Sequence, residues 1–231
     1  MSPLTEQLWR AGAWRPTRRA ATILTTPTTF AALDSTAAIL DPIWFAHRFA
    51  EGYRLYVLHT TDWGATTPWW RTEAQLGAAL ASGLKVGAYT RDPQTWQAGI
   101  EACGPYIDRL QFFALDVETE GPLGDPGHQV TRAMVDGVMA MGVRPVIYTG
   151  SGMWPLVMGP GNTAFADVPL WDTDTSNPPS SPTMSQPAPV AYGGWNVPGH
   201  MRVMVQQAFD VTVEGIALDQ NSVDPAFLED L

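Results

Sequence analysis

The chain has 231 residues and a formal net charge of −10, with 45% hydrophobic and 16% charged residues. This composition is typical of a globular protein with one large core rather than of a disordered chain. The excess of acids argues against nucleic acid as a partner, because phosphate binding needs clustered Lys and Arg. No apolar run reaches the ~18 residues of a membrane span. The first thirty residues carry four Arg but no long apolar block, so they lack the pattern of a standard secretory signal.

Short apolar segments alternate with helical patterns along the chain. We predict eight strands, at residues 29–35, 53–59, 85–90, 112–118, 145–150, 168–174, 203–209 and 215–221. Four helices are predicted to start at Asp-Pro pairs, because Asp caps a helix and Pro fits its first position. These pairs begin at Asp41, Asp92, Asp125 and Asp224. Thr72 and Gln75 match a capping box at a fifth start, and Gly83 and Gly142 are suited to end helices.

The alternation of strands and helices predicts a parallel sheet. Eight parallel strands in one domain indicate a closed α/β barrel, with little helix among the last three strands. An open doubly wound sheet is the alternative, but no glycine-rich phosphate loop follows the first strand. The Pro- and Ser-rich segment 176–200 is predicted to be a long loop over one face of the barrel. Tyr192 and Trp195 in this loop are expected to line a groove.

Acidic residues lie at the ends of three predicted strands. Asp34 and Asp219 each follow an apolar run, and Asp116 and Glu118 lie two residues apart at the end of another strand. Because barrel active sites form at the C-terminal ends of strands, we expect these four carboxylates to meet in one pocket. The alternative is that each Asp only caps the loop or helix that follows it.

Clustered carboxylates without His or Cys suit two chemistries. One is the binding of a hard metal ion by oxygen ligands, and the other is glycoside hydrolysis by an acid and a partner carboxylate. The ten Trp residues favour the second. The single cysteine, Cys103, has neighbours that predict a buried small residue. No metal site and no cofactor are therefore expected.

The order of several short motifs resembles glycoside hydrolase family 25, the N-acetylmuramidases of phage and bacterial lysins. The matching segments, over residues 29–231, are LDST, GLKVGAYT, LDVE, VIYTG, PLWDTD, and QQAF followed by GIALDQN. They contain Asp34, Tyr89, Asp116, Glu118, Tyr148, Trp171, Gln206, Asp219 and Asn221. Three segments depart from the family pattern. His59 stands where the family has Lys, Thr90 stands where it has His, and LWDTDT lacks the usual Ala and Tyr.

The resemblance implies a single irregular TIM-like barrel, (β/α)5(β)3, and a lysozyme-like enzyme that cleaves peptidoglycan after N-acetylmuramic acid. It implies that Glu118 is the general acid and that Asp116 stabilises the transition state or orients the substrate's acetamido group. Asp34 and Asp219 would support the pocket's hydrogen-bond network. Substrate contacts are then expected from Tyr89, Tyr148, Trp171, Tyr192, Trp195, Gln206 and Asn221.

Residues 1–28 lie outside the resemblance and carry four Arg against one Glu. We predict that they form an extension that docks on phage tail or virion proteins, and that residues 29–231 form the barrel. The expected location is a virion, or the cell wall after release by lysis. The alternative is a structural or wall-docking phage module with weak or no catalysis. The altered motifs favour the module, whereas the retained acids favour the enzyme.

Overall fold

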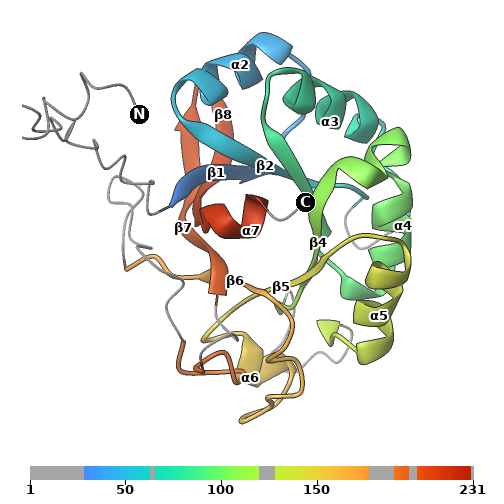
Figure 1. Ribbon diagram of the computed structural model, residues 1–231, viewed down its shortest axis with the longest axis vertical. Coiled ribbons are helices and arrows are strands. Elements are labelled where there is room, and N and C mark those ends of the chain that lie inside the picture. Colours follow the sequence, from blue (N-terminus) through green and yellow to red (C-terminus); the bar gives the residue numbers. More distant parts are fainter. Residues whose placement is uncertain (1–28, 63–65, 120–127, 177–189, 198–201, 230–231) are drawn as a thin grey trace, which may run out of the picture.

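The computed structural model describes residues 29–62, 66–119, 128–176, 190–197 and 202–229. Eight strands close into one barrel in the order of the sequence (Figure 1). The strands are β1 (Phe30–Ser35), β2 (Tyr53–His59), β3 (Lys85–Thr90), β4 (Leu110–Asp116), β5 (Pro145–Gly150), β6 (Leu170–Thr173), β7 (Arg202–Val213) and β8 (Ile216–Val223). The predicted single barrel is therefore confirmed, and the open doubly wound sheet is not the fold. Residues 1–28 lie outside the described residues, so the docking extension stays a prediction.

Helices cover the barrel along one side, where α2 to α5 follow the first strands (Figure 1). The helices are α2 (Pro42–Ala50), α3 (Thr72–Ala81), α4 (Trp96–Glu101), α5 (Arg132–Ala140), α6 (Trp154–Val157) and α7 (Pro225–Glu229), with 3-10 turns η1 (Pro93–Thr95) and η2 (Gly104–Arg109). Within the described residues, no helix is long and apolar enough to cross a membrane.

The direction of the last strand differs from the prediction of eight parallel strands. Neighbouring strands from β1 to β7 pair in parallel, but β8 is antiparallel to both β7 and β1. The reason is the two-residue turn between β7 and β8, in which Glu214 has φ +50° and Gly215 has φ +81°. A two-residue turn can join only antiparallel strands, since a parallel pair needs a long crossover.

Three of the predicted helix caps are present. The carboxylates of Asp41, Asp92 and Asp224 each accept a hydrogen bond from the backbone N–H two residues later. The fourth, Asp125, lies outside the described residues. The predicted capping box is wrong, because tertiary partners take both side chains. The Thr72 hydroxyl donates to the Thr60 carbonyl oxygen, and the Gln75 amide donates to the Tyr56 hydroxyl.

Two apolar cores lie on the two sides of the strands. The outer core joins the strands to the helices, and it includes Cys103, which is fully buried as predicted. The inner core fills the barrel with side chains such as Ala32, Phe112 and Ala114. These inner residues alternate along each strand with residues of the outer core, as expected for strands with a period of two.

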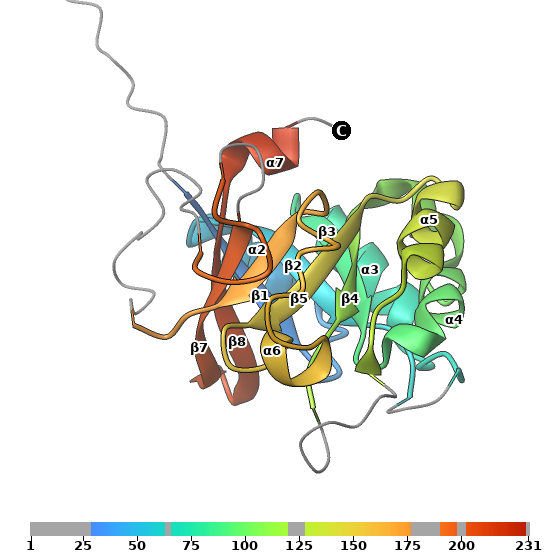
Figure 2. The same ribbon diagram turned by 90° about the horizontal axis from the view of Figure 1, so that it is seen from below.

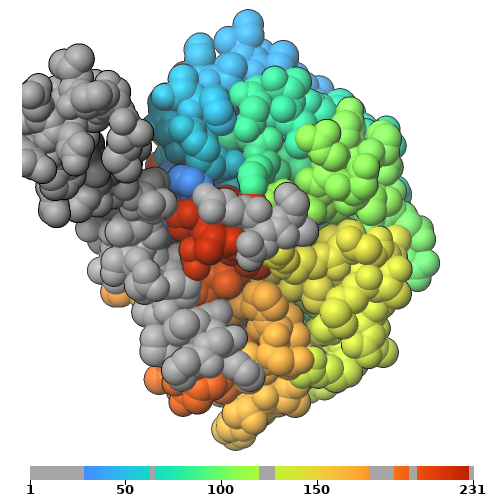
Figure 3. Space-filling model, viewed as in Figure 1, coloured from blue at the N-terminus to red at the C-terminus, as the bar shows by residue number. Residues whose placement is uncertain are grey.

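Helix α7 closes the barrel at the N-terminal ends of the strands. Its Phe227 packs against Phe112 inside the barrel, with ring centroids 5.8 Å apart. The Arg144 guanidinium, next to the start of β5, donates to the Phe227 carbonyl oxygen at 2.7 Å, and the Lys85 amine of β3 donates to the Leu228 carbonyl oxygen. Figure 3 shows the red residues of α7 at the centre of this face, and Figure 2 shows α7 projecting at one end of the barrel.

Candidate active site

The alternation along the inner face of the barrel places the acidic residues at its open mouth. On β1, Asp34 follows inward-facing Ala32, and on β4, Asp116 follows inward-facing Ala114. Asp219 reaches the same mouth from the middle of β8, where it pairs in register with Asp34. We predicted that Asp219 lies at the end of a parallel strand. It lies instead in the middle of the antiparallel strand β8 and still reaches the mouth.

A cavity of about 290 Å³ opens at this mouth, and all four predicted carboxylates line it. Glu118 lies two residues beyond Asp116, just after β4, and it is partly exposed. Asp34 and Asp116 are only 4% and 2% exposed, so their charged forms have little contact with water. The other lining residues are Thr36, Tyr89, Arg91, Tyr148, Trp171, Gln206, Phe209 and Asp210.

Gln206 of β7 connects the two carboxylates that face each other across β1 and β8. Its amide nitrogen donates to Asp34 Oδ1 at 3.1 Å and to Asp219 Oδ2 at 2.9 Å, while its amide oxygen accepts from the Tyr148 hydroxyl. Asn221 lies deeper and does not line the cavity. It donates to Asp34 Oδ1 at 2.6 Å, so it orients a carboxylate rather than facing the mouth.

Burial raises the pKa values of all four carboxylates. The pKa of Asp34 rises from 3.8 to about 7, mainly through burial and then through the charge of Asp219. Burial also raises the pKa of Asp116 well above its usual range, with a further contribution from Glu118. The pKa of Glu118 is raised by burial, and the positive charge of Arg91 opposes that shift. The site therefore favours protonated carboxyl groups at a higher pH than water does.

Aromatic rings form the base of the cavity. The rings of Tyr148 and Trp171 meet edge to face with centroids 4.7 Å apart, and Tyr89 contacts Trp171 at 6.2 Å. The Trp171 indole N–H donates to Asn221 Oδ1 at 2.8 Å, which fixes the ring beneath the carboxylates. These three aromatic residues were predicted as substrate contacts, and all three line the cavity.

Besides Asn221, two other predicted contact residues do not line the cavity. Trp195 is fully buried, its indole N–H donates to the Val168 carbonyl oxygen, and its ring packs on Trp154 with centroids 4.9 Å apart. This corrects the expectation that Trp195 lines a groove, because the ring belongs to the outer core. Most of the predicted loop 176–200 falls outside the described residues, in 177–189 and 198–201.

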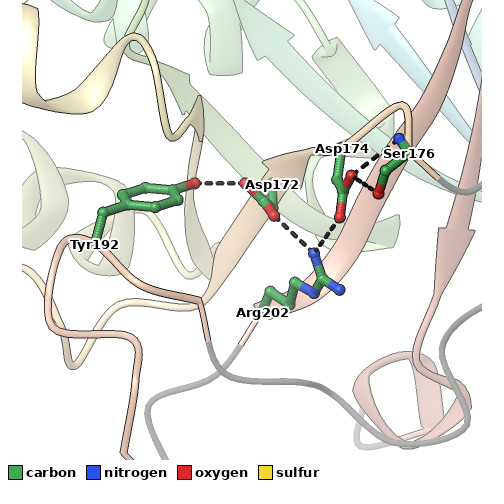
Figure 4. Close-up of polar contacts among 5 residues, drawn as sticks. All are labelled: Asp172, Asp174, Ser176, Tyr192 and Arg202. Carbon is green, nitrogen blue, oxygen red and sulfur yellow. Dashed lines mark hydrogen bonds and ion pairs between the residues drawn. The ribbon is translucent and has the colours of Figure 1, made fainter.

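Tyr192 also lies away from the cavity, in a polar cluster around strand β6 (Figure 4). Its hydroxyl donates to Asp172 Oδ1 at 2.5 Å. Arg202 Nη1 donates to Asp172 Oδ2 at 2.8 Å and to Asp174 Oδ2 at 3.3 Å, so it joins the start of β7 to the end of β6. The cluster fixes the segment of Tyr192 to the strands. Tyr192 lines a separate pocket beside α6 and not the cavity of the carboxylates.

Sequence reasoning missed four residues that line the cavity, which are Thr36, Arg91, Phe209 and Asp210. Arg91 directly follows β3, so the rule that pointed to Glu118 just after β4 also applied to it. Asp210 directly follows the predicted strand 203–209, so the same rule applied to it as well, whereas Phe209 carried no such signal. Among the described residues, no group of three or more His, Cys, Asp or Glu is arranged to hold a metal ion.

Comparison of the fold with solved structures finds several barrels of the same kind. The CTP1L endolysin matches with a TM-score of 0.60 and 18% identity over 87% of this chain and 68% of that chain. A muramidase from Acremonium alcalophilum gives 0.55 and 20% identity over 86% and 96% of the two chains, and a family GH25 lysozyme from Aspergillus fumigatus gives 0.53 and 16% over 85% and 94%. No family model matches the sequence, and no curated protein matches it. The chain thus shares the fold of these proteins at low sequence identity.

Proposed function

We propose that this chain is a divergent member of glycoside hydrolase family 25 and an N-acetylmuramidase that cleaves peptidoglycan. The observation that carries the proposal is the cavity at the barrel mouth, where Asp34, Asp116, Glu118 and Asp219 lie together. The shared fold with muramidases and lysozymes supports the same conclusion. Phage origin, and release to the cell wall at lysis, are supported by the likeness to the CTP1L endolysin alone.

Glu118 is the proposed general acid that protonates the glycosidic oxygen as the bond breaks. Its partial burial favours the protonated form, and its place at the rim lets a bound glycan reach it. The Glu118 carboxylate left after proton transfer is stabilised by the nearby positive charge of Arg91. Both properties suit an acid that must hold a proton and then release it.

Asp116 is the proposed partner carboxylate. Its Oδ1 is buried and has no hydrogen-bond partner among the described residues, so this acceptor remains available to a substrate group. An acceptor in this place can bind the substrate's acetamido N–H or stabilise positive charge at the anomeric carbon. Asp34 and Asp219 support the pocket through Gln206, and Tyr89, Tyr148 and Trp171 provide the surface on which a sugar ring rests.

The test is to compare the parent protein with Glu118→Gln in the release of reducing ends from purified peptidoglycan. The amide keeps the size of the acid but cannot donate its proton, so we expect activity to fall by about 10²- to 10⁴-fold. The matched control is Glu101→Gln, an exposed residue of α4 outside the cavity, which should keep parental activity. Thermal unfolding of each variant checks that the barrel remains intact.

The same assay addresses the structural or wall-docking alternative. A folded parent protein that releases no reducing ends from any peptidoglycan tested would support that alternative and contradict the muramidase proposal. If Glu118→Gln keeps parental activity, Glu118 is not the acid, and the role passes to another carboxylate of the cavity. Docking of residues 1–28 on phage tail or virion proteins remains a proposal, and deleting these residues should leave hydrolysis largely unchanged.

A further inference from the structure

Arg91 is the one basic residue among the described residues that line the cavity. Five acidic side chains share the lining with it, namely Asp34, Asp116, Glu118, Asp210 and Asp219. The positive charge of Arg91 acts on two of them, since it lowers the pKa values of Asp116 and Glu118 against the effect of burial. Arg91 thus lines the same cavity as the pair of carboxylates at the end of β4 and acts on both of them.

The backbone of Arg91 is held in place by the neighbouring strand. Its N–H donates to His59 Nε2 at 3.1 Å. His59 is 1% exposed, and its ring packs edge to face against Trp69 at 4.6 Å and Tyr89 at 4.9 Å. Burial lowers the pKa of His59 to about 3, so the ring is neutral and Nε2 can accept this bond. The backbone of Arg91 is thus fixed by packing between β2, β3 and the segment that contains Trp69.

The positive charge of Arg91 among acidic residues indicates which kind of substrate group it can bind. The ionised acids of this cavity repel an anionic ligand. N-acetylmuramic acid without a stem peptide carries a lactyl carboxylate that N-acetylglucosamine lacks, whereas a stem peptide converts this carboxyl to a neutral amide. A guanidinium is the side chain best suited to bind a carboxylate, because its planar N–H groups can donate two parallel hydrogen bonds. One such group among the acids would offset this repulsion for a ligand whose carboxylate reaches Arg91.

We propose that Arg91 forms a subsite for the free lactyl carboxylate of muramic acid residues that carry no stem peptide, and thereby favours peptide-free muramyl glycans over neutral chitin-like glycans. The inference rests on the proposed muramidase function and names the residue that would bind the charged group of the substrate. It also gives His59 a positioning role, since the ring anchors the backbone of Arg91 beside the cavity.

The experiment is an NMR titration of the parent and of Arg91→Gln with two disaccharides. One is N-acetylglucosaminyl-N-acetylmuramic acid, and the other is N,N′-diacetylchitobiose, which has no carboxylate. We expect Arg91→Gln to weaken binding of the muramyl disaccharide by about 10- to 100-fold, as for loss of a charge-assisted hydrogen bond, and to change chitobiose binding by less than about twofold. Arg91→Lys should retain part of the selectivity, and Arg109→Gln, an exposed control on η2, should match the parent.

The outcomes separate this proposal from the proposed function. Equal weakening of both disaccharides, or none, in a folded Arg91→Gln protein would overturn the carboxylate subsite, while release of reducing ends by the parent would still support the muramidase. If Arg91→Gln selectively weakens binding of the muramyl disaccharide but the parent does not hydrolyse peptidoglycan, the result would support the subsite and contradict the muramidase proposal. A parent that binds neither disaccharide would overturn the carboxylate subsite, and the muramidase would then be judged by the release of reducing ends alone.

Discussion

Replacing Asp34 with Asn tests the electrostatics of the buried carboxylates through the stability of the protein. In the folded state the pKa of Asp34 is about 7, against 3.8 for an exposed carboxyl. Between these pH values the folded protein keeps a proton on Asp34 that the unfolded chain has lost. The contribution of Asp34 to the free energy of unfolding is therefore greatest at low pH and falls as pH rises toward 7. A difference of about three pH units corresponds to about 4 kcal/mol.

The Asn side chain does not titrate, so Asp34→Asn lacks this loss. At pH 4 we expect the variant to be less stable than the parent by about 1 kcal/mol, because Gln206 donates to both carboxyl oxygens of Asp34 and the amide offers a single acceptor oxygen. At pH 7 we expect the order to reverse, with the variant more stable by about 3 kcal/mol. The free energy of unfolding is measured by urea denaturation at several pH values and constant ionic strength.

The control is Asp108→Asn, an exposed carboxylate on η2, which should differ from the parent by no more than about 0.5 kcal/mol. A gap between parent and Asp34→Asn that does not change from pH 4 to pH 7 would show that Asp34 titrates as it does in water. The argument that burial at the barrel mouth raises the carboxylate pKa values would then fail.

Two further variants test the corrected positions of aromatic and charged residues. Trp195→Ala should destabilise the fold by about 3 to 5 kcal/mol, because the ring is fully buried against Trp154, yet the folded protein should hydrolyse peptidoglycan at the parental rate. A lower rate of hydrolysis with unchanged stability would indicate that Trp195 contacts the substrate after all. Arg202→Met should cost about 3 kcal/mol at pH 7, because it leaves the Asp172 carboxylate, only 5% exposed, without its cation. Adding Asp172→Asn should recover part of that loss in chemical denaturation, and no recovery would mean that packing rather than charge holds the cluster.

The strands and the acids at the barrel mouth follow from local sequence patterns. Period-two alternation places Asp34 and Asp116 on the inner face, and apolar runs locate the eight strands to within a few residues. Such patterns reach only a few residues along the chain. They therefore predict which face a side chain takes on a strand, and the closure of the barrel then brings those faces together.

Features that depend on distant partners could not be read in the same way. The side chain of Gln75 matches a helix cap in sequence, but the Tyr56 hydroxyl, in a neighbouring strand, takes its amide. Trp195 lies in a segment without periodicity, so nothing local distinguished a core ring from one that faces a ligand. The reversed direction of β8 depends on the turn at Glu214 and Gly215. The glycine in the sequence was compatible with such a tight turn, but it did not by itself distinguish a turn from the start of a parallel strand.

The pairing of the first strand with the last has a consequence for how the protein folds during synthesis. Asn221 donates to Asp34 across 187 positions of the chain, and β1 pairs along its length with β8. Neither contact can form until β8 has left the ribosome, and contacts of such large sequence separation slow folding. The pocket is thus assembled only at ring closure, so an emerging chain carries no preformed site with which to cleave or bind a glycan.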